Sequence, residues 1–166
     1  YKLNVFHLHL TDNSGWRLES KRYPQLQSPS AFSRKPDKFY SQEDFVELLE
    51  FCEERHLQLI PELDIPGHTE AFRKALGIKT MNSVEVQNII CELVDELCAL
   101  IPADRMPYIH LGTDEARKAA EKVDQDYLVP ILKRLEENER TYVSWWHGIK
   151  TSGDSTSIKQ LWAQTE

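Results

Sequence analysis

The sequence predicts an α/β fold of the parallel (β/α)8 or TIM-barrel type, here a partial barrel of about five strands. Short apolar runs typical of buried strands alternate along the chain with amphipathic helical patterns, and this order builds a parallel sheet. Polar residues follow the ends of several successive strands, as they do around the rim of a barrel. A doubly wound sheet would gather them at one switch point behind a glycine-rich loop, and no such loop follows the first strand.

The first half of the chain should form a strand, a helix and a second strand. Residues 2–10 are rich in Val, Phe and Leu and predict the first strand. A capping box at residues 41–44 should begin a helix whose apolar residues recur at helical spacing to about Arg55. Residues 57–60 are the next expected strand, which Pro61 should end.

The second half repeats this pattern. Apolar residues at helical spacing predict helices over residues 86–100 and 127–135. Strands are expected at residues 108–111, 141–145 and 158–162. Five strands result, whereas a complete barrel has eight strands and about 250 residues.

Residues 1–166 are therefore expected to be one partial (β/α) barrel domain that lacks strands at both ends. The open edges of such a sheet could support a homo-oligomer. With 20 Lys and Arg against 27 Asp and Glu, the net charge of −7 would repel a phosphate backbone, so nucleic acid is not an expected partner. No apolar run is long enough to cross a bilayer, so no membrane partner is expected either. Cys52, Cys91 and Cys98 lie in apolar helical stripes and are expected to be core thiols.

Two consecutive carboxylates, Asp114 and Glu115, stand where the strand at residues 108–111 gives way to a loop. Neighbouring carboxylates repel each other, and burial that raised the pKa of one would divide them into an acid and an anion. Glycoside cleavage suits that division of labour. The alternative is an exposed pair at a helix start, where the helix dipole favours acidic residues. The pair alone does not decide between these interpretations.

Further candidates follow the first two strands. Asp12 comes after the first strand, and Asp64 and His68 bracket a Pro-Gly turn after the second. A carboxylate and an imidazole could meet there at the rim, although a lone histidine in a turn is more often structural. His7 and His9 face one side of the first strand and raise the alternative of a metal site. A zinc site needs a third ligand, however, so no metal and no other cofactor is expected.

Tryptophans stand at or just beyond the later strand ends. Trp145 and Trp162 do so, with Trp146 beside the first of them. Aromatic faces pack well against the C–H face of a sugar, so tryptophans at the rim suit a carbohydrate site. Ordinary core packing is the alternative for each of them.

Three segments together resemble glycoside hydrolase family 20, the β-N-acetylhexosaminidases. They are KLNVFHLHLTD at residues 2–12 with GWR at 15–17, PELDIPGH at 61–68, and HLGTDE at 110–115. Their order and spacing agree with the family across the first 115 residues. The final strands match more weakly, through Trp145 and Trp162 only.

The resemblance implies hydrolysis of terminal β-linked N-acetylhexosamine from glycans, with N-acetylglucosamine or N-acetylgalactosamine as the sugar. The mechanism would be retaining, with the substrate's own 2-acetamido oxygen attacking the anomeric carbon. Glu115 would be the general acid and later the base, and Asp114 would orient the acetamido group. Asp12 and His68 would form a supporting pair near the acid.

The resemblance also implies a set of substrate-binding residues. Trp145 and Trp162 would wall the pocket that holds the acetamido methyl group, and Asp64 and His110 would line the substrate site with them. A carbohydrate with a terminal N-acetylhexosamine is the expected partner.

The chain departs from the family pattern at three places. Thr113 stands where a second glycine is common, Asn13-Ser14 replaces Asp-Gln, and Trp146-His147 replaces an acidic pair. None of these positions is the proposed acid or its partner. They bear on the shape of the sugar pocket, and therefore on the preference between the two N-acetylhexosamines.

Two other functions stay open at this point. The barrel could bind sugar without catalysis or be an inactive fragment, or it could be a metal-dependent hydrolase that uses His7, His9 and an aspartate. A chelator would abolish the activity of the metal-dependent hydrolase and leave a family 20 enzyme unaffected. Cellular location is open as well, although enzymes of this family are commonly exported or lysosomal.

Overall fold

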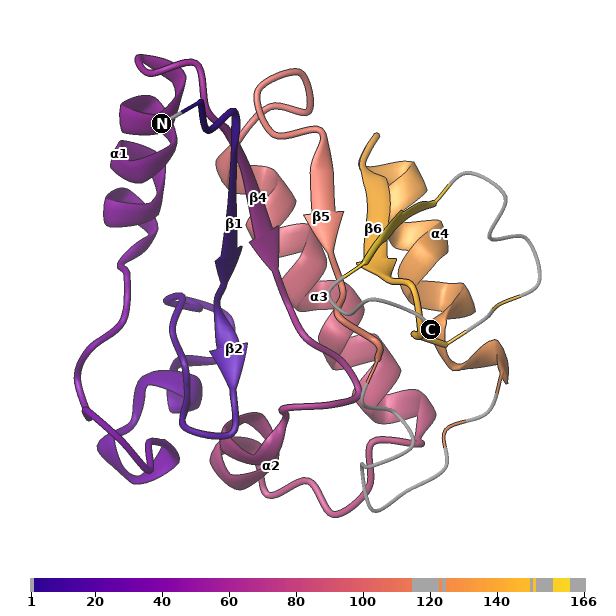
Figure 1. The fold of residues 1–166 in the computed structure, drawn as a ribbon. Coiled ribbons are helices and arrows are strands. Elements are labelled where there is room, and N and C mark those ends of the chain that lie inside the picture. Colours follow the sequence, from indigo (N-terminus) through magenta and orange to yellow (C-terminus); the bar gives the residue numbers. More distant parts are fainter. Residues whose placement is uncertain (1, 115–122, 124, 150, 152–156, 162–166) are drawn as a thin grey trace.

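The computed structural model describes residues 2–114, 123, 125–149, 151 and 157–161. Five parallel strands form one sheet in the order β1-β4-β5-β6-β7. Their bounds are β1 Val5–His9, β4 Gln58–Glu62, β5 Tyr108–His110, β6 Thr141–Trp145 and β7 Ile158–Gln160. Neighbours in this sheet are also neighbours in chain order, which is the winding of a barrel and excludes a doubly wound sheet. The sheet curls into a half-barrel, so the predicted fold class is confirmed (Figure 1).

Three longer helices lie on the outer side of the sheet, and a short one lies near the carboxyl ends of the strands (Figure 1). They are α1 Gln42–Glu53, α3 Val84–Leu100, α4 Val129–Glu137 and the short α2 Glu70–Leu76. Single 3₁₀ turns occur at η1 Pro24–Gln27, η2 Pro29–Ala31 and η3 Gln125–Leu128. Within the part of the chain that the structure describes, no helix combines the length and apolar character needed to cross a membrane.

Local sequence explains where the first long helix begins. The Ser41 hydroxyl accepts a hydrogen bond from the Asp44 N–H at 2.9 Å, and the Asp44 carboxylate accepts one from the Ser41 N–H at 2.9 Å. This is the predicted capping box. The buried face of α1 carries Phe45, Leu49 and Cys52. The helix therefore packs by the stripe that its sequence predicts.

The two faces of the sheet differ in character. Leu59 and Ile109 are fully buried in the apolar core that includes the helices. The opposite, concave face carries polar side chains. In the strand register, His9 of β1 lies opposite Glu62 of β4, and Glu62 lies opposite His110 of β5. Residues in register project to the same face of a parallel sheet. The concave face is thus lined with titratable groups at the carboxyl ends of the strands.

The prediction that Pro61 ends its strand is wrong, because β4 continues through Pro61 to Glu62. Pro61 lies opposite Leu8 of β1. Pairing with β5 begins only at Glu62, and the Leu63 N–H then donates to the His110 carbonyl at 2.9 Å. Proline is tolerated where no ladder hydrogen bond is required from its nitrogen.

Other boundaries also differ from the predicted ones, by up to three residues. The first strand spans Val5–His9 and is followed by a small antiparallel hairpin of β2 Thr11–Asp12 and β3 Gly15–Trp16. The last predicted strand is present at Ile158–Gln160. The three cysteines are buried and form no disulfide, as expected of core thiols.

Candidate functional site

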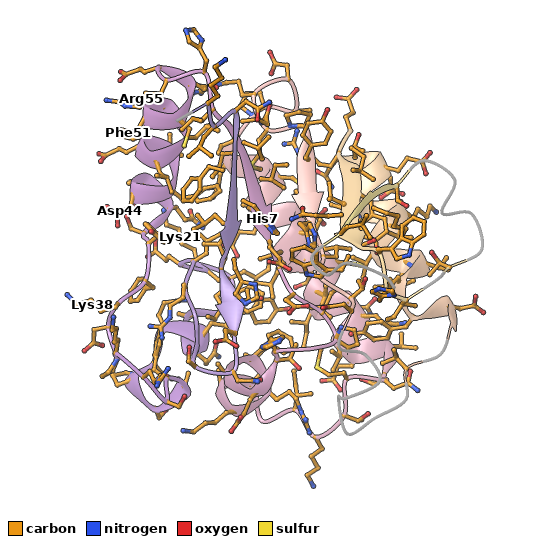
Figure 2. All side chains as sticks on the ribbon, viewed as in Figure 1. His7, Lys21, Lys38, Asp44, Phe51 and Arg55 are labelled. Atoms are coloured by element: carbon orange, nitrogen blue, oxygen red, sulfur yellow. The ribbon has the colours of Figure 1, made fainter. Side chains whose placement is uncertain are left out.

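Most of the predicted site residues meet at the carboxyl ends of β1, β4, β5 and β6. These ends lie together at one edge of the curled sheet (Figure 1). In Figure 2, His7 lies over the middle of the sheet, whereas Lys38, Asp44 and Arg55 lie at the periphery on the side of α1. Parallel strands present their carboxyl ends to one rim, which is where barrel enzymes carry their chemistry.

Asp12 and His68 form a hydrogen-bonded pair at this rim. The His68 Nδ1 lies 2.8 Å from the Asp12 Oδ1. The same oxygen accepts the Asn13 N–H at 2.7 Å, and the other carboxylate oxygen accepts the Ser14 hydroxyl at 3.2 Å. Partial burial acts to raise the pKa of Asp12, but the hydrogen bond from His68 and those from its neighbours outweigh it and lower that pKa. Asp12 therefore stays ionised and orients the imidazole.

Asp64 is buried next to this pair. Its carboxylate Oδ2 lies 3.9 Å from the His68 Nε2, and its backbone N–H donates to the Thr11 hydroxyl at 2.8 Å. Burial, together with the negative charge of Glu62, raises the pKa of Asp64 to about 7. The charge of Asp114 acts in the same direction. Asp64 can therefore hold or release a proton near neutrality.

Gly112 makes room for the Asp64 carboxylate. Its backbone has φ +64°, and a Cβ atom built there would lie 1.8 Å from the Asp64 Oδ1. The next residue, Thr113, directs its N–H toward the same oxygen at 3.4 Å. The turn that follows β5 (Tyr108–His110) thus places its backbone directly against Asp64.

A fourth carboxylate, Glu62, was not predicted. It closes β4, and only 2% of its side chain is exposed. Its Oε2 lies 2.7 Å from the His9 Nδ1, and its Oε1 accepts a hydrogen bond from the Trp145 Nε1 at 3.2 Å. The missed signal was the two-residue alternation of the strand, since expecting the strand to end at Ile60 left Glu62 outside it.

His110 and Trp145 complete this inner cluster. The His110 Nδ1 accepts the Gly112 N–H at 2.9 Å, and burial lowers the pKa of the His110 side chain despite the nearby Glu62. The His110 and Trp145 rings meet edge to face, with their centroids 4.8 Å apart. His7 packs against both rings, with its ring centroid 4.5 Å from that of His110 and 5.5 Å from that of Trp145.

Comparison with known families accounts for this arrangement. The model of glycosyl hydrolase family 20, catalytic domain, matches residues 1–83, half of the chain. The chain belongs to this family. The matched part holds the first two of the three signature segments, and the third follows it at residues 110–115.

Relatives within the family cover most of this chain. The beta-hexosaminidase of Vibrio furnissii is 34% identical over 151 residues, which cover 69% of this chain and 24% of that protein. The beta-N-acetylhexosaminidase of Cellulomonas fimi is 31% identical over 189 residues, which cover 98% of this chain and 37% of that protein. The chain thus spans well under half the length of these curated relatives.

A solved structure supports the same assignment. The GH20 exo-beta-N-acetylglucosaminidase of Vibrio harveyi, solved in complex with N-acetylglucosamine, matches this fold with a TM-score of 0.77 at 26% identity. The match covers 98% of this chain and 34% of that chain. The half-barrel is therefore the fold of a family 20 catalytic barrel over these residues.

Of the predicted site residues, the structure brings Asp12, Asp64, His68, His110 and Trp145 into this cluster. Asp114 is half-buried, and its charge acts on the neighbouring Asp64 and His110. Glu115 and Trp162 lie outside the described residues. The predicted site residues of the three signature segments, as far as Asp114, thus lie at the same rim.

Two groups of side chains in the described part of the chain have ligand atoms close enough to hold a metal ion. They are His7, Glu62 and His110, and His9, Asp64 and His68, with their ligand atoms within 4.8 Å of one another. Each group supplies the third ligand that the sequence alone did not show. In the second group, hydrogen bonds to residues outside it already engage the His9 Nδ1, which contacts Glu62, and the His68 Nδ1, which contacts Asp12.

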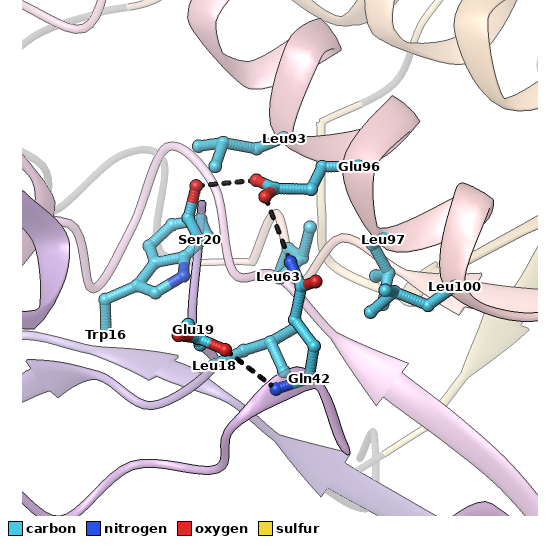
Figure 3. Close-up of a pocket in the computed structure, with 10 residues that line it drawn as sticks. All are labelled: Trp16, Leu18, Glu19, Ser20, Gln42, Leu63, Leu93, Glu96, Leu97 and Leu100. Carbon is cyan, nitrogen blue, oxygen red and sulfur yellow. Dashed lines mark hydrogen bonds between the residues drawn. The ribbon is translucent and has the colours of Figure 1, made fainter. Parts of the chain in front are cut away.

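A separate small cavity of about 10 Å³ lies between α3, the start of α1 and the segment after β3 (Figure 3). Ten residues line it, among them Trp16, Gln42, Leu63 and Glu96. This volume is about that of one water molecule, whereas small-molecule sites usually measure about 300 Å³ or more. The cavity is therefore not a sugar site.

Proposed function

We propose that the whole protein hydrolyses terminal β-linked N-acetylhexosamine from glycans by the substrate-assisted, retaining mechanism. The observation that carries this proposal is the Asp12–His68 pair beside Asp64, at the carboxyl-end rim of a family 20 half-barrel. The names of the relatives support the substrate class, because they are hexosaminidases. The preference between N-acetylglucosamine and N-acetylgalactosamine depends on the departures at Asn13-Ser14, Thr113 and Trp146-His147.

The roles follow from the chemistry of the reaction. Glu115 donates a proton to the leaving oxygen and later takes one from water, while Asp114 orients the 2-acetamido group for attack on the anomeric carbon. The Asp12–His68 pair adjusts the proton affinity of the acid. No metal or other cofactor takes part, because the nucleophile comes from the substrate and the proton from Glu115.

The remaining proposed roles concern the sugar pocket. Trp145 and Trp162 wall the acetamido group, and Asp64 and His110 line the site beneath it. Carbohydrate is the proposed partner, and the net charge of −7 argues against nucleic acid.

We further propose that residues 1–166 are part of a larger barrel domain. β1 and β7 are the two edges of the described sheet, and both carry exposed apolar side chains, Val5 and Phe6 on one edge and Ile158 on the other. Exposed apolar edges of this kind favour pairing with further strands, or with a second copy of the chain.

The test is a chromogenic aryl N-acetyl-β-hexosaminide assay on the whole protein and on its Glu115→Gln variant. The wild type should release the chromophore, and Glu115→Gln should lower kcat/KM by about 10²–10⁴-fold, because it removes the proton donor. Glu53→Gln is the matched control, since Glu53 pairs with Arg105 at 2.6 Å on the outside of α1. A folded wild type without activity, or a Glu115→Gln variant with near-normal activity, would contradict the proposal. A loss of activity with a chelator would instead favour the metal-dependent alternative.

A further inference from the structure

Glu62 is a buried carboxylate with four nitrogen atoms around it. Its Oε2 lies 2.7 Å from the His9 Nδ1 and 3.1 Å from the His7 Nε2. Its Oε1 lies 3.2 Å from the Trp145 Nε1 and 3.3 Å from the His110 Nδ1. The contacts with His9 and Trp145 are hydrogen bonds, one to each carboxylate oxygen, while the His7 and His110 rings lie close to the same carboxylate.

The surroundings of Glu62 stabilise its ionised form. Burial alone would raise its pKa, but the contacts with His110, His7 and His9 outweigh that effect and hold the pKa well below its ordinary value. A proton on the His7 Nε2 fits this arrangement, because the amide nitrogen of Gln160 lies 3.3 Å from the His7 Nδ1. Glu62 is thus a fixed anion beneath the rim.

Trp145 is the neighbour of Glu62 that reaches the proposed sugar pocket. Its indole N–H donates to the Glu62 Oε1, and its ring contacts the His110 ring edge to face at 4.8 Å. The centroid of the His7 ring lies 5.5 Å from that of the indole. Both histidines also contact Glu62. The hydrogen bond and the two ring contacts of the indole therefore all involve Glu62 or a residue in contact with it.

From this convergence we infer that Glu62 is a positioning residue of the reaction: its buried carboxylate holds the Trp145 indole in the orientation that walls the acetamido pocket. The inference rests on the proposed function, which supplies the role of Trp145. A hydrogen bond to an ionised acceptor is stronger and more directional than one to a neutral group, so a neutral residue of the same shape holds the indole less well.

The test is a double-mutant cycle in the whole protein with Glu62→Gln, Trp145→Phe and the double variant. Glu62→Gln keeps the size of the side chain and removes its charge, while Trp145→Phe keeps an aromatic wall and removes the indole N–H. Each single variant should lower kcat/KM by about ten-fold, the loss expected for one hydrogen bond to a charged group. The double variant should lose little more than either single variant, because both changes sever the same link. Glu53→Gln is the control and should match the wild type.

A second readout does not depend on activity. Protein labelled with ¹⁵N-tryptophan gives one NMR signal for each indole N–H. The signal that is present in the wild type and absent from Trp145→Phe belongs to Trp145. Its N–H should exchange slowly with solvent in the wild type and faster in Glu62→Gln. The wild-type measurement stands even if Glu62→Gln fails to fold.

Three results would overturn the inference. The first is a double variant whose loss of kcat/KM equals the product of the two single losses. The second is fast exchange of the Trp145 indole N–H in the wild type, and the third is an exchange rate that Glu62→Gln leaves unchanged. Absence of hydrolysis by the wild type would instead refute the proposed function, and the exchange measurement would still decide the role of Glu62.

Discussion

At the scale of single residues, the turn after β5 depends on two left-handed positions. Gly112 has φ +64°, and Thr113 has φ +78°. The first brings the backbone against the Asp64 carboxylate, and the second leads directly into Asp114. The position of both carboxylates therefore depends on backbone conformations that few residues adopt easily.

Gly112→Ala should destabilise the protein by more than about 3 kcal/mol, because a clash adds to the cost of a left-handed backbone. The new Cβ would lie 1.8 Å from the Asp64 Oδ1. Gly77→Ala is the matched control, since Gly77 has φ +67° with nothing within 4 Å of a new Cβ. Gly77→Ala should lower the free energy of unfolding, measured by urea denaturation, by only about 1 kcal/mol. Equal losses in the two variants would show that Gly112 is not needed for close approach.

Thr113→Gly should raise the free energy of unfolding by about 1 kcal/mol, because relief of strain exceeds the entropy cost of a new glycine. Thr113 is fully buried, β-branched and at positive φ. Thr69→Gly is the control of opposite sign, because Thr69 has φ −105° and its hydroxyl donates to the Pro66 carbonyl at 3.0 Å. A Thr113→Gly variant less stable than the wild type would mean that this turn stores no strain.

Sequence reasoning reached most of the rim residues because their types and positions after strands are visible without coordinates. Asp12, Asp64, His68 and His110 each follow or close a strand, and the structure joins them by hydrogen bonds or short contacts. Glu62 was missed because Pro61 suggested a strand end. The convergence of four side chains on one carboxylate depends on register between four strands, β1, β4, β5 and β6, which a single sequence does not show.

At the scale of elements, the Glu96 side chain on α3 ties two other parts of the chain together. Its carboxylate accepts hydrogen bonds from the Ser20 hydroxyl at 2.6 Å, the Lys21 N–H at 2.7 Å, the Arg22 N–H at 3.2 Å and the Gln42 side-chain amide at 3.0 Å. Figure 3 shows Glu96 between Ser20 and Gln42. These bonds fix the segment after β3 and the start of α1 against α3.

Glu96→Ala should therefore lower the free energy of unfolding by about 2 kcal/mol, because several partly buried donors lose their acceptor. Glu136→Ala is the control, since Glu136 is exposed on α4. It should change stability by less than about 0.5 kcal/mol. Thermal denaturation followed by circular dichroism compares the two, and equal effects would argue against this role of Glu96.

The spacing of apolar residues in the sequence predicted the longer helices and strands. The helix expected at residues 86–100 is present as Val84–Leu100, and the strand at 141–145 is present as expected. The hairpin of β2 and β3 has two-residue strands, and α2 has seven residues. Elements this short hold too few apolar positions for a period to be recognised.

At the scale of the whole molecule, the concave face concentrates negative charge and so links stability to pH. Asp64 has its pKa raised from 3.8 to about 7 by burial and by Glu62. A raised carboxyl pKa means that the native state binds the proton more tightly than the unfolded chain. The stability that Asp64 contributes is therefore fully present below the unfolded value of 3.8 and is lost as pH rises to about 7.

Asp64→Asn should accordingly stabilise the protein at about pH 8, by on the order of 4 kcal/mol, and the gain should vanish toward about pH 4. Asp12→Asn is the control, because the pKa of Asp12 is lowered, and it should destabilise the protein at the same high pH. Urea denaturation across this pH range measures both variants. A gain for Asp64→Asn that is independent of pH would contradict the buried, proton-binding carboxyl.

We propose that the substrate supplies the nucleophile through its acetamido oxygen. The most direct measurement compares kcat/KM of the whole protein on an aryl N-acetyl-β-glucosaminide and on its N-trifluoroacetyl analogue. Fluorine withdraws electron density from the amide oxygen, so kcat/KM should fall by about 10²-fold if that oxygen attacks the anomeric carbon. Equal kcat/KM values on the two substrates would contradict the account.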